Sequence, residues 1–403
     1  MILEFSVKNF LSFKDKVTFS LIANSNNGLD NNYITINDKK ILKTSAIYGA
    51  NASGKTNIFK IIDIVIKMLK KSNNNDVFDK LPIIPFKFDD SINNSSEFEI
   101  KFIVNNIRYV YGFIADKNII YEEYLYYYPN GRETKIFDRT NKNNYSFSQK
   151  EFKILNDIAI KNAPNKFFIA SATNWNYEKT KIPYKFLTQD INVFYNISDI
   201  QENALKEYFI NDDKLRKFTL EFLKKADFNI IDYKVIEVDI PKELMPNMFK
   251  ENKILTAIFK HKDSNLELTY EEESKGTQII FSFIPFIMDA INNKKVIMID
   301  ELDRSLHPYL VEMIVELFND TDINKSSSQL IFDTHDTNLL KQNILRRDQI
   351  WFIEKNPDNG VSDLFPLSDF KVRKDENIEK GYLLGRYGAV PFIKNDFILW
   401  EEK

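Results

Sequence analysis

The chain has 403 residues, of which 43% are hydrophobic and 28% are charged, so it can bury the cores of two lobes or domains. Its formal net charge of −3 excludes a strongly basic overall field, the usual mark of a protein held on nucleic acid or on an anionic membrane. The absence of cysteine excludes disulfides and cysteine-based zinc sites and fits a reducing compartment. Because we find neither a signal-peptide pattern nor an apolar run of membrane-spanning length, we expect a soluble cytoplasmic protein.

The first part of the chain contains two predicted strands and then a phosphate-binding loop. Alternating apolar residues predict the strands within residues 1–23. Further on, the apolar residues 46–48 are typical of a strand end, and apolar residues recur at helical spacing from Ile58 to Leu69. Between this strand and this helix stands Gly49-x-x-x-x-Gly54-Lys55-Thr56, the complete phosphate-loop pattern.

This loop predicts nucleotide binding for a physical reason. Small residues allow backbone N–H groups to turn towards a triphosphate, and the helix N-terminus adds its dipole. We expect Lys55 to reach the β- and γ-phosphates of ATP, and we expect Thr56 to hold Mg²⁺. The expected nucleotide-binding residues of the loop are Gly49, Ala50, Asn51, Ala52, Ser53, Gly54, Lys55 and Thr56.

An antiparallel sheet is predicted after the first helix. Two prolines keep residues 81–88 out of a helix interior, and three segments with strand composition follow, with turn signals between them. The dipeptide Asn130-Gly131 predicts a hairpin to a fourth strand. The tyrosines of residues 121–128 suit packing within a strand, and a ligand-stacking surface is the alternative. The four strands are expected at residues 98–104, 107–113, 119–128 and 135–137.

The middle and last parts of the chain alternate helical patterns with short apolar segments. No heptad pattern lasts for several turns, so we expect no long coiled coil. Helices are expected at residues 152–160, within 200–227, at 277–291 and at 309–318. Strands or buried segments are expected at residues 167–170, 191–195, 229–240, 295–299, 329–332, 349–353 and 362–367. A hairpin is expected between residues 254–259 and 266–270, around residues 263–265.

A second motif with chemical meaning is Val296-Ile-Met-Ile-Asp300-Glu301, in which four apolar residues precede two carboxylates. A buried strand that ends in Asp presents this side chain at the edge of the sheet where ligands bind in α/β proteins. We expect Asp300 to bind Mg²⁺ through water, and Glu301 to orient or deprotonate the attacking water. The pattern is common by itself, but beside a complete phosphate loop it predicts ATP hydrolysis.

Ser274 and Gly276 stand directly before the predicted helix that begins at Thr277. A hydroxyl and free N–H groups at a helix start can bind an anion such as a phosphate. Simple capping of the helix by Ser274 or Thr277 is the alternative reading, and it is the better one for this segment taken alone.

The chain has three histidines, of which His335 has the clearest functional context. His335 follows the apolar segment 329–332 and could bond a γ-phosphate and sense its loss, whereas a histidine in a plain loop is the alternative. His307 precedes Pro308, which is expected at the first position of the next helix. His261 has no partner pattern, and we expect it to be a surface residue.

The order of these motifs resembles the ABC-type ATPase module of SMC-like and OLD-like proteins. That order is a phosphate loop, a long insert, Ser-x-Gly at a helix start, a strand with Asp-Glu, a Ser-Leu-His turn and a strand with Thr-His. The resemblance implies that Ser274–Gln278 is the signature segment, which contacts the γ-phosphate held by a second subunit. It implies that Asp303–His307 is exchanged across that dimer and that His335 is the switch histidine. It also places Val7–Phe13 near the nucleotide base.

The chain further resembles the bacterial AAA-family ATP-binding proteins of the abortive-infection or RloA-like group. The signature differs, because it reads Ser-Lys-Gly-Thr-Gln in place of Leu-Ser-Gly-Gly-Gln, and Pro85–Phe88 occupies the region of the glutamine loop without a glutamine. No C-terminal nuclease domain is evident. The stretches that carry this resemblance are Val7–Phe13, Gly49–Thr56, Pro85–Phe86, Asp300–Pro308, Asp348–Glu354 and Gly385–Ala389.

We therefore expect an α/β fold, a phosphate-loop NTPase of ABC-ATPase head type, with a mixed sheet, an antiparallel β subdomain and a helical insert. Residues 1–140 are expected to form a nucleotide-binding lobe with the β meander, and residues 141–250 a partly helical insert. Residues 251–403 are expected to form a C-terminal lobe with the signature segment, the acidic strand and the switch histidine.

The resemblance implies an ATPase with ATP and Mg²⁺ as cofactors and with Glu301, His335 and Lys55 as catalytic residues. It implies a homodimer or higher oligomer that forms on ATP binding and regulates an effector in anti-phage defence, with a nuclease-type protein encoded nearby as a candidate effector. Two alternatives stay open: a nucleotide-sensing scaffold that hydrolyses ATP slowly, and an ATP-dependent DNA-processing enzyme. The sequence leaves nucleic-acid binding open and indicates no membrane association.

Overall fold

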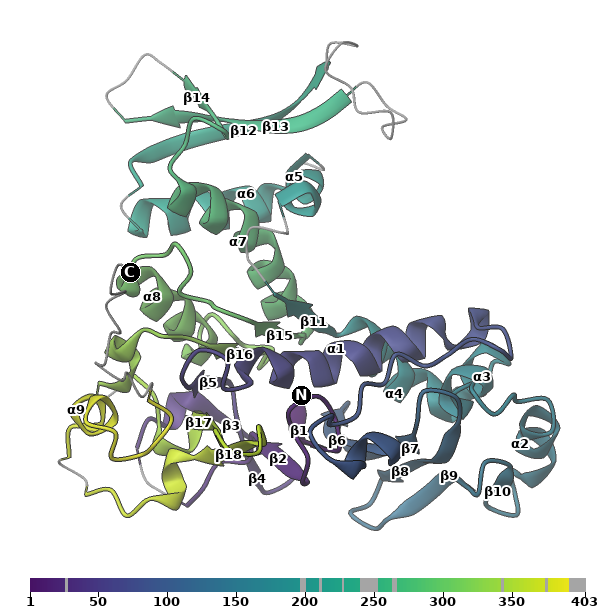
Figure 1. Ribbon diagram of the computed structural model, residues 1–403. Helices are drawn as coiled ribbons and strands as arrows, with labels where there is room; N and C mark the ends of the chain where they lie inside the picture. Colours follow the sequence, from purple (N-terminus) through teal and green to yellow (C-terminus); the bar gives the residue numbers. More distant parts are fainter. Residues whose placement is uncertain are drawn as a thin grey trace, which may run out of the picture.

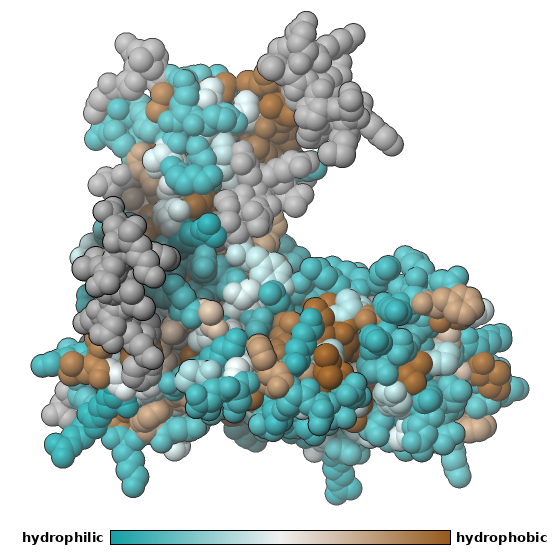
Figure 2. All heavy atoms as spheres, viewed as in Figure 1, coloured by the Kyte–Doolittle hydropathy of each residue, from teal (hydrophilic) through white to brown (hydrophobic). Residues whose placement is uncertain are grey.

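The computed structural model describes residues 1–25, 28–195, 201–209, 212–226, 228–239, 253–262, 267–341, 344–373 and 376–390. Figure 1 shows a broad base that contains the two large sheets and the long helix α1 (Lys55–Lys71). A second part rises from one side of the base and contains a small sheet and the helices α5 (Gln201–Phe209) and α6 (Asp213–Lys225). Helix α7 (Lys275–Asn293) joins the two parts, and Figure 2 shows a concave angle between them on a mostly hydrophilic face.

The predicted antiparallel meander forms most of a seven-stranded sheet in the described residues. Strands β6 and β7 pair with Val104 opposite Ile107, and the two residues between them, Asn105 and Asn106, have φ angles of 51° and 61°. Asparagine tolerates this left-handed conformation, which two-residue hairpin turns require. In spatial order the strands are β10 (Asn144–Ser146), β9 (Thr134–Thr140), β8 (Ile120–Tyr128), β7 (Ile107–Ala115), β6 (Ser96–Val104), β1 (Ile2–Lys8) and β2 (Val17–Ser20).

A second sheet, six-stranded in the described residues, carries the phosphate loop and confirms the expected α/β core. Its first five strands in spatial order are parallel, and the sixth pairs antiparallel with the fifth. The carboxyl ends of the parallel strands therefore meet at one edge, where ligands bind in such sheets. The strands in spatial order are β11 (Ile191–Phe194), β15 (Val296–Ile299), β16 (Gln329–Asp333), β5 (Thr44–Tyr48), β17 (Ile350–Lys355) and β18 (Ser362–Pro366).

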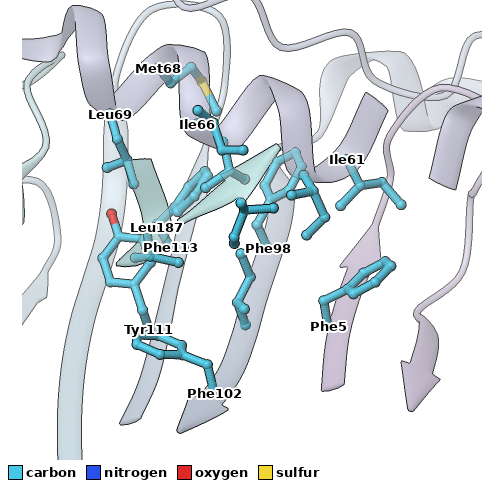
Figure 3. Close-up of a cluster of buried hydrophobic side chains, with 14 of the residues drawn as sticks. Phe5, Ile61, Ile66, Met68, Leu69, Phe98, Phe102, Tyr111, Phe113 and Leu187 are labelled. Carbon is cyan, nitrogen blue, oxygen red and sulfur yellow. The ribbon is translucent and has the colours of Figure 1, made fainter. Parts of the chain in front are cut away.

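Two hydrophobic clusters cover opposite faces of the six-stranded sheet. On β5, Ile47 belongs to the first cluster, whereas Ala46 and Tyr48 belong to the second, because side chains alternate along a strand. The first cluster joins the sheet to α1 and to the antiparallel sheet, and Figure 3 shows how side chains from α1, β6, β7 and α4 (Glu178–Gln189) meet there. The second cluster contains α7 and α8 (Pro308–Asn319) and continues into the rising part.

The segment 141–250, expected as one insert, contributes to both clusters. Helices α2 (Phe152–Ala159), α3 (Phe168–Asn174) and α4 pack in the first cluster. Helices α5 and α6 and strand β12 (Ile230–Asp239) pack in the second, where β12 pairs with β13 (Lys253–His261) and β13 pairs with β14 (Glu267–Thr269). The boundaries of the three expected parts of the chain remain a prediction.

The structure confirms the predicted helices and strands in the described residues, with ends shifted by a few positions, and shows that residues 168–170 of the expected buried segment 167–170 are the first residues of α3. Sequence patterns missed α4, the hairpin of β3 (Tyr33–Ile36) and β4 (Lys39–Leu42), and α9 (Ile378–Leu383). Helix α4 contains Pro183, which is unfavourable in a helix interior and hides the pattern. The expected turn at residues 263–265 lies outside the described residues.

Candidate nucleotide site

The phosphate loop lies between the end of β5 and the start of α1, as predicted. Its two glycines are required by space and backbone conformation. A Cβ atom on Gly49 would lie 2.5 Å from the carbonyl oxygen of Ile353 on β17. Gly54 has a φ of +115°, and a Cβ there would lie 2.7 Å from Ser362 Oγ, so the loop rests closely on β17 and β18. The hydroxyl of Ser362 also donates a 2.6 Å hydrogen bond to the carbonyl of Ser53.

Lys55 is buried under its own loop. Its Nζ donates hydrogen bonds to the carbonyl oxygens of Gly49 (2.9 Å) and Ala50 (3.4 Å). Burial lowers the pKa of Lys55, and the negative charges of Asp333 and Asp300 act in the opposite direction. The ammonium therefore faces the carboxyl edge of β15 and β16, where the predicted acidic residues lie.

The two residues predicted to hold Mg²⁺ are in contact. Thr56 Oγ1 donates a 3.3 Å hydrogen bond to Asp300 Oδ1, which brings together the start of α1 and the end of β15. Asp300 is buried, and this burial raises its pKa. Its backbone N–H donates to the carbonyl of Phe194 on the neighbouring strand β11, which holds the chain at this edge.

Glu301 and His335 line one cavity with the tip of the phosphate loop. The cavity has a volume of about 340 Å³ and is lined by Asn51, Glu301, Asp303, Arg304 and His335. The side chain of Glu301 is 45% exposed, and its Oε2 lies 3.2 Å from Arg304 Nη1. The backbone N–H of His335 donates to Asp303 Oδ2 (3.1 Å), and burial lowers the pKa of the imidazole. The predicted base, switch histidine and phosphate loop therefore share one hollow.

Asp333 was not predicted as a site residue, although it lies at the centre of this group. It is the last residue of β16, is fully buried, and accepts the backbone N–H of Glu301 at 2.5 Å through Oδ1. Burial, with the negative charge of Asp300 next, raises the pKa of Asp333 well above its usual range. The available signal was the same as for Asp300, an apolar strand followed by a carboxylate.

The structure places Ser274 and Gly276 outside this cavity, whose lining among the described residues includes neither. Ser274 caps α7, since its Oγ accepts the backbone N–H of Thr277 at 3.1 Å. A Cβ on Gly276 would lie 3.6 Å from the carbonyl oxygen of Ser305. Within one chain, the segment therefore lies against the loop that follows the acidic pair.

Two histidines outside the cavity have structural contacts. His261, expected at the surface, keeps 20% of its side chain exposed, and its Nε2 lies 2.5 Å from Oε1 of the buried Glu273, next to Ser274, a partner that the sequence did not indicate. This contact joins β13 to the segment before α7, and folding of the small sheet creates it. His307 Nδ1 accepts the backbone N–H of Tyr309, and Pro308 begins α8, as predicted.

A second hollow of about 670 Å³ lies against the outer side of the phosphate loop. Phe88 stands at this hollow with 69% of its surface exposed, and Lys355 Nζ lies 5.8 Å from the centre of its ring. The opening segment of the chain lies nearby, since Ser12 Oγ accepts a 2.8 Å hydrogen bond from Asn57 in the first turn of α1. The lining residues are Ala50, Asn51, Ala52, Ser53, Phe88, the residues 354–360, Ala389 and Val390.

The residues at the carboxyl edge fit a Mg²⁺ ion that is completed by phosphate oxygens and water. Within the described residues, no group of three or more His, Asp or Glu side chains is arranged to hold a metal by itself. Mg²⁺ commonly takes one or two carboxylates together with substrate phosphates, so such a group is not required. Asp333 Oδ2 is buried without a hydrogen-bond partner among the described residues, which is the kind of atom that a cation or its water satisfies.

The fold and the site define a class of protein. A phosphate loop on β5, an acidic pair after β15, a histidine after β16 and an antiparallel sheet across α1 are the architecture of a phosphate-loop NTPase of ABC-ATPase head type (Figure 1). The family model described as "AAA domain, putative AbiEii toxin, Type IV TA system" matches residues 45–341, and the chain belongs to this family.

A comparison with solved structures found SMC head domains. One from Thermotoga maritima has 14% sequence identity and a TM-score of 0.44, over 91% of this chain and 98% of that chain. An SMC head bound to the C-winged helix domain of ScpA has 16% identity and a TM-score of 0.43, over 91% and 97%. A Pyrococcus furiosus SMC head with an extended coiled coil, bound to the C-terminal domain of ScpA, has 14% identity and a TM-score of 0.41, over 96% and 98%.

A search of curated proteins gave no match. None of the helices in the described part of the chain combines the length and the apolar character that crossing a membrane requires.

Proposed function

We propose that the chain binds Mg²⁺–ATP and hydrolyses it. The observation that carries this proposal is the contact between Thr56 and Asp300, which joins the phosphate loop to the acidic strand. The next residue, Glu301, lines a cavity with the loop tip and His335. A pair of oxygen ligands beside a phosphate loop, followed by a carboxylate in an open cavity, supports hydrolysis of a terminal phosphate.

Each residue has a distinct part in the proposed reaction. The loop Gly49–Thr56 surrounds the phosphates, and Lys55 exchanges its carbonyl contacts for phosphate oxygens. Thr56 and Asp300 would hold Mg²⁺, which would supply positive charge beside the phosphates. Glu301 orients the attacking water and accepts its proton, and His335 hydrogen-bonds the γ-phosphate.

The hollow on the outer side of the loop is our proposed position for the base and ribose of ATP. The ring of Phe88 is exposed there, and an exposed aromatic face can stack on a base. The hollow begins at Ala50–Ser53, so a nucleotide with its phosphates in the loop can reach it without leaving the surface of the chain.

We further propose that ATP joins two copies of the chain. Ser274 and Gly276 lie outside the cavity of their own chain and beside the loop Asp303–His307, so they are available to a nucleotide held by a second copy. In a symmetric dimer each composite site is built twice, and bound ATP strengthens the association by mass action. Light scattering of Glu301→Gln should show a dimer with Mg²⁺–ATP and a smaller species without it. A monomer under both conditions contradicts the shared site.

A mixing experiment tests whether the site is composite. Lys55→Ala and Ser274→Arg should each be inactive alone, because each damages both sites of a homodimer. In a mixed dimer one site carries both changes and the other carries neither, so part of the phosphate release should return. Mixtures that stay inactive, while the Glu301→Gln dimer still forms with ATP, would mean that the two sites work only together.

The family description, which names a toxin of a type IV toxin–antitoxin system, supports a role for this ATPase in abortive infection. We propose that the ATP cycle regulates an effector protein in anti-phage defence.

A second candidate function is a nucleotide sensor that hydrolyses ATP slowly. The ion pair between Glu301 and Arg304 favours it, because a carboxylate that is held by a guanidinium is less available to orient an attacking water. Steady-state phosphate release that depends on Glu301 supports the ATPase. Tight ATP binding without such release supports the sensor.

A further inference from the structure

Asp333 lies between the two elements that form the nucleotide site. Strand β16 is parallel to β15 on one side and to β5 on the other, with Phe332 opposite Ile299 and Asp333 opposite Ile47. Its last residue therefore stands at the carboxyl edge between Asp300 and the phosphate loop. This position follows from the order of the strands in the sheet, which is visible in Figure 1.

The two oxygens of the Asp333 carboxylate have different surroundings. Oδ1 accepts the backbone N–H of Glu301 at 2.5 Å, and the carbonyl of Asp333 accepts the N–H of Leu302 at 3.1 Å. Glu301 has a φ of 56°, a left-handed conformation that is uncommon for this residue type, so these two bonds fix a turn that carries the proposed base. Oδ2 is buried and has no hydrogen-bond partner among the described residues.

The negative charges around Asp333 favour the binding of a cation beside its carboxylate. The negative charge of Asp300 acts on Asp333, and Glu301 follows Asp300 in the chain. Lys55 contributes one positive charge, but its Nζ is bonded to the carbonyls of Gly49 and Ala50. Buried carboxylates are normally paired or bound to a metal, whereas Oδ2 of Asp333 has no partner among the described residues.

We propose that Asp333 is a further carboxylate of the Mg²⁺ site, which acts on the cation or its water through Oδ2 together with Thr56 and Asp300. Through Oδ1 the same side chain is a positioning residue for Glu301. The inference rests on the proposed function and extends it: one carboxylate links the occupancy of the cation site to the backbone that carries the base.

The alternative is that Asp333 only fixes the turn at Glu301. Asparagine separates the two roles, because its carbonyl oxygen can still accept the N–H of Glu301 while the negative charge is lost. Asp336→Asn is a matched control, since Asp336 also has a buried Oδ2 without a partner in the described structure. Its Oδ1 accepts the N–H of Asn338, and it does not line the cavity of Glu301.

The experiment measures Mn²⁺ binding to the full chain by electron paramagnetic resonance of the free ion, with and without a non-hydrolysable ATP analogue. Asp333→Asn should bind Mn²⁺ at least about tenfold more weakly than the unmodified chain in the presence of the analogue. Its affinity for the analogue in EDTA should be unchanged, and Asp336→Asn should bind Mn²⁺ normally.

Several outcomes would overturn the proposal. Binding of Mn²⁺ by Asp333→Asn within twofold of the unmodified chain overturns this inference alone and leaves the ATPase proposal standing. No Mn²⁺ binding by the unmodified chain with the analogue overturns both. A circular-dichroism melting curve establishes that Asp333→Asn is folded. If it is not, Asp333→Ser, which keeps a smaller polar group, takes its place and must show the same loss of Mn²⁺ affinity.

Discussion

Glu123 and Asp333 are both fully buried carboxylates, in the two different sheets of the base, and their surroundings differ sharply. Every oxygen of Glu123 is engaged, and its partners tie β8 to the start of α3. Arg139, also fully buried, donates hydrogen bonds to three backbone carbonyls of its own. The partners of Glu123 are the N–H groups of Phe168 (2.6 Å) and Ile169 (3.0 Å), the hydroxyl of Tyr111 (3.1 Å) and the guanidinium of Arg139 (3.7 Å).

Asp333 is the opposite case, because one of its oxygens has no partner in the described structure and the negative charge of Asp300 acts on it. A buried network in which every polar atom has a partner holds elements together. A buried polar atom without a partner destabilises the fold by itself, and it marks a place where a ligand is expected. We therefore expect changes at Glu123 to alter stability, and changes around Asp333 to alter ligand binding and chemistry.

The largest expected effect is on stability, at Glu123. Glu123→Ala should lower the free energy of unfolding by about 3–5 kcal/mol, because it leaves the charge of Arg139 buried without its carboxylate and uncaps α3. Urea unfolding followed by circular dichroism measures this. Glu122→Ala, the half-buried neighbour on the same strand, is the control. A loss below about 1 kcal/mol would contradict the structural role of the network.

The next effect is on chemistry, at the cavity. Glu301→Gln should slow steady-state phosphate release about 100-fold or more, because glutamine keeps the shape of the side chain but cannot accept a proton from the attacking water. ATP affinity and the unfolding temperature should stay close to those of the unmodified chain, since the side chain is 45% exposed. Glu312→Gln on α8 should leave the rate unchanged. Phosphate release by Glu301→Gln at the original rate would refute the assignment of the base.

A smaller effect is expected at the hollow beside the phosphate loop. Phe88→Ala should weaken ATP binding about tenfold, roughly 1.4 kcal/mol, through loss of a stacking surface for the base. Phe78→Ala is a matched control, because Phe78 is 89% exposed and does not line the hollow. Titration with a fluorescent ATP analogue, competed by ATP, gives both affinities. Equal losses of ATP affinity for the two variants would mean that Phe88 does not contact the base.

The smallest expected effect is a change in unfolding temperature that has opposite directions for Asp333 and Glu123. Without divalent cations, Asp333→Asn should raise the unfolding temperature by about one degree, about 1 kcal/mol, because the Asp333 carboxyl group must either carry a buried charge beside Asp300 or take up a proton, and asparagine does neither. Glu123→Gln should lower the unfolding temperature, since it weakens the pairing with Arg139. Differential scanning calorimetry in EDTA measures both. A lower unfolding temperature for Asp333→Asn would mean that Asp333, like Glu123, stabilises the fold.

Much of the site could be predicted because its motifs are local. The loop at residues 49–56 needs glycine at Gly49 and Gly54, and the structure shows why, with Ile353 and Ser362 too close for a side chain. The acidic strand is a run of buried apolar residues that ends in Asp300, and such a run predicts its own burial. The helical insert was harder, because its residues pack in two separate clusters that no local pattern distinguishes.

The role of Asp333 shows where prediction from sequence stops. Its local pattern, an apolar strand followed by a carboxylate, is the same as that of Asp300. What differs is that β16 lies between β15 and β5, so its end faces both the acidic pair and the loop. The pairs His261–Glu273 and Thr56–Asp300 depend in the same way on elements that meet only in the folded chain.

The amino-acid sequence by itself determined the phosphate loop, the acidic strand, the meander and most helices, because these depend on interactions among residues close together in the chain. Only the tertiary structure decided which buried carboxylates have partners for both oxygens and which keep an oxygen without a partner among the described residues. That distinction depends on the order of strands in the six-stranded sheet and on contacts such as that between Asp333 and Glu301, where packing of the whole core sets the distances.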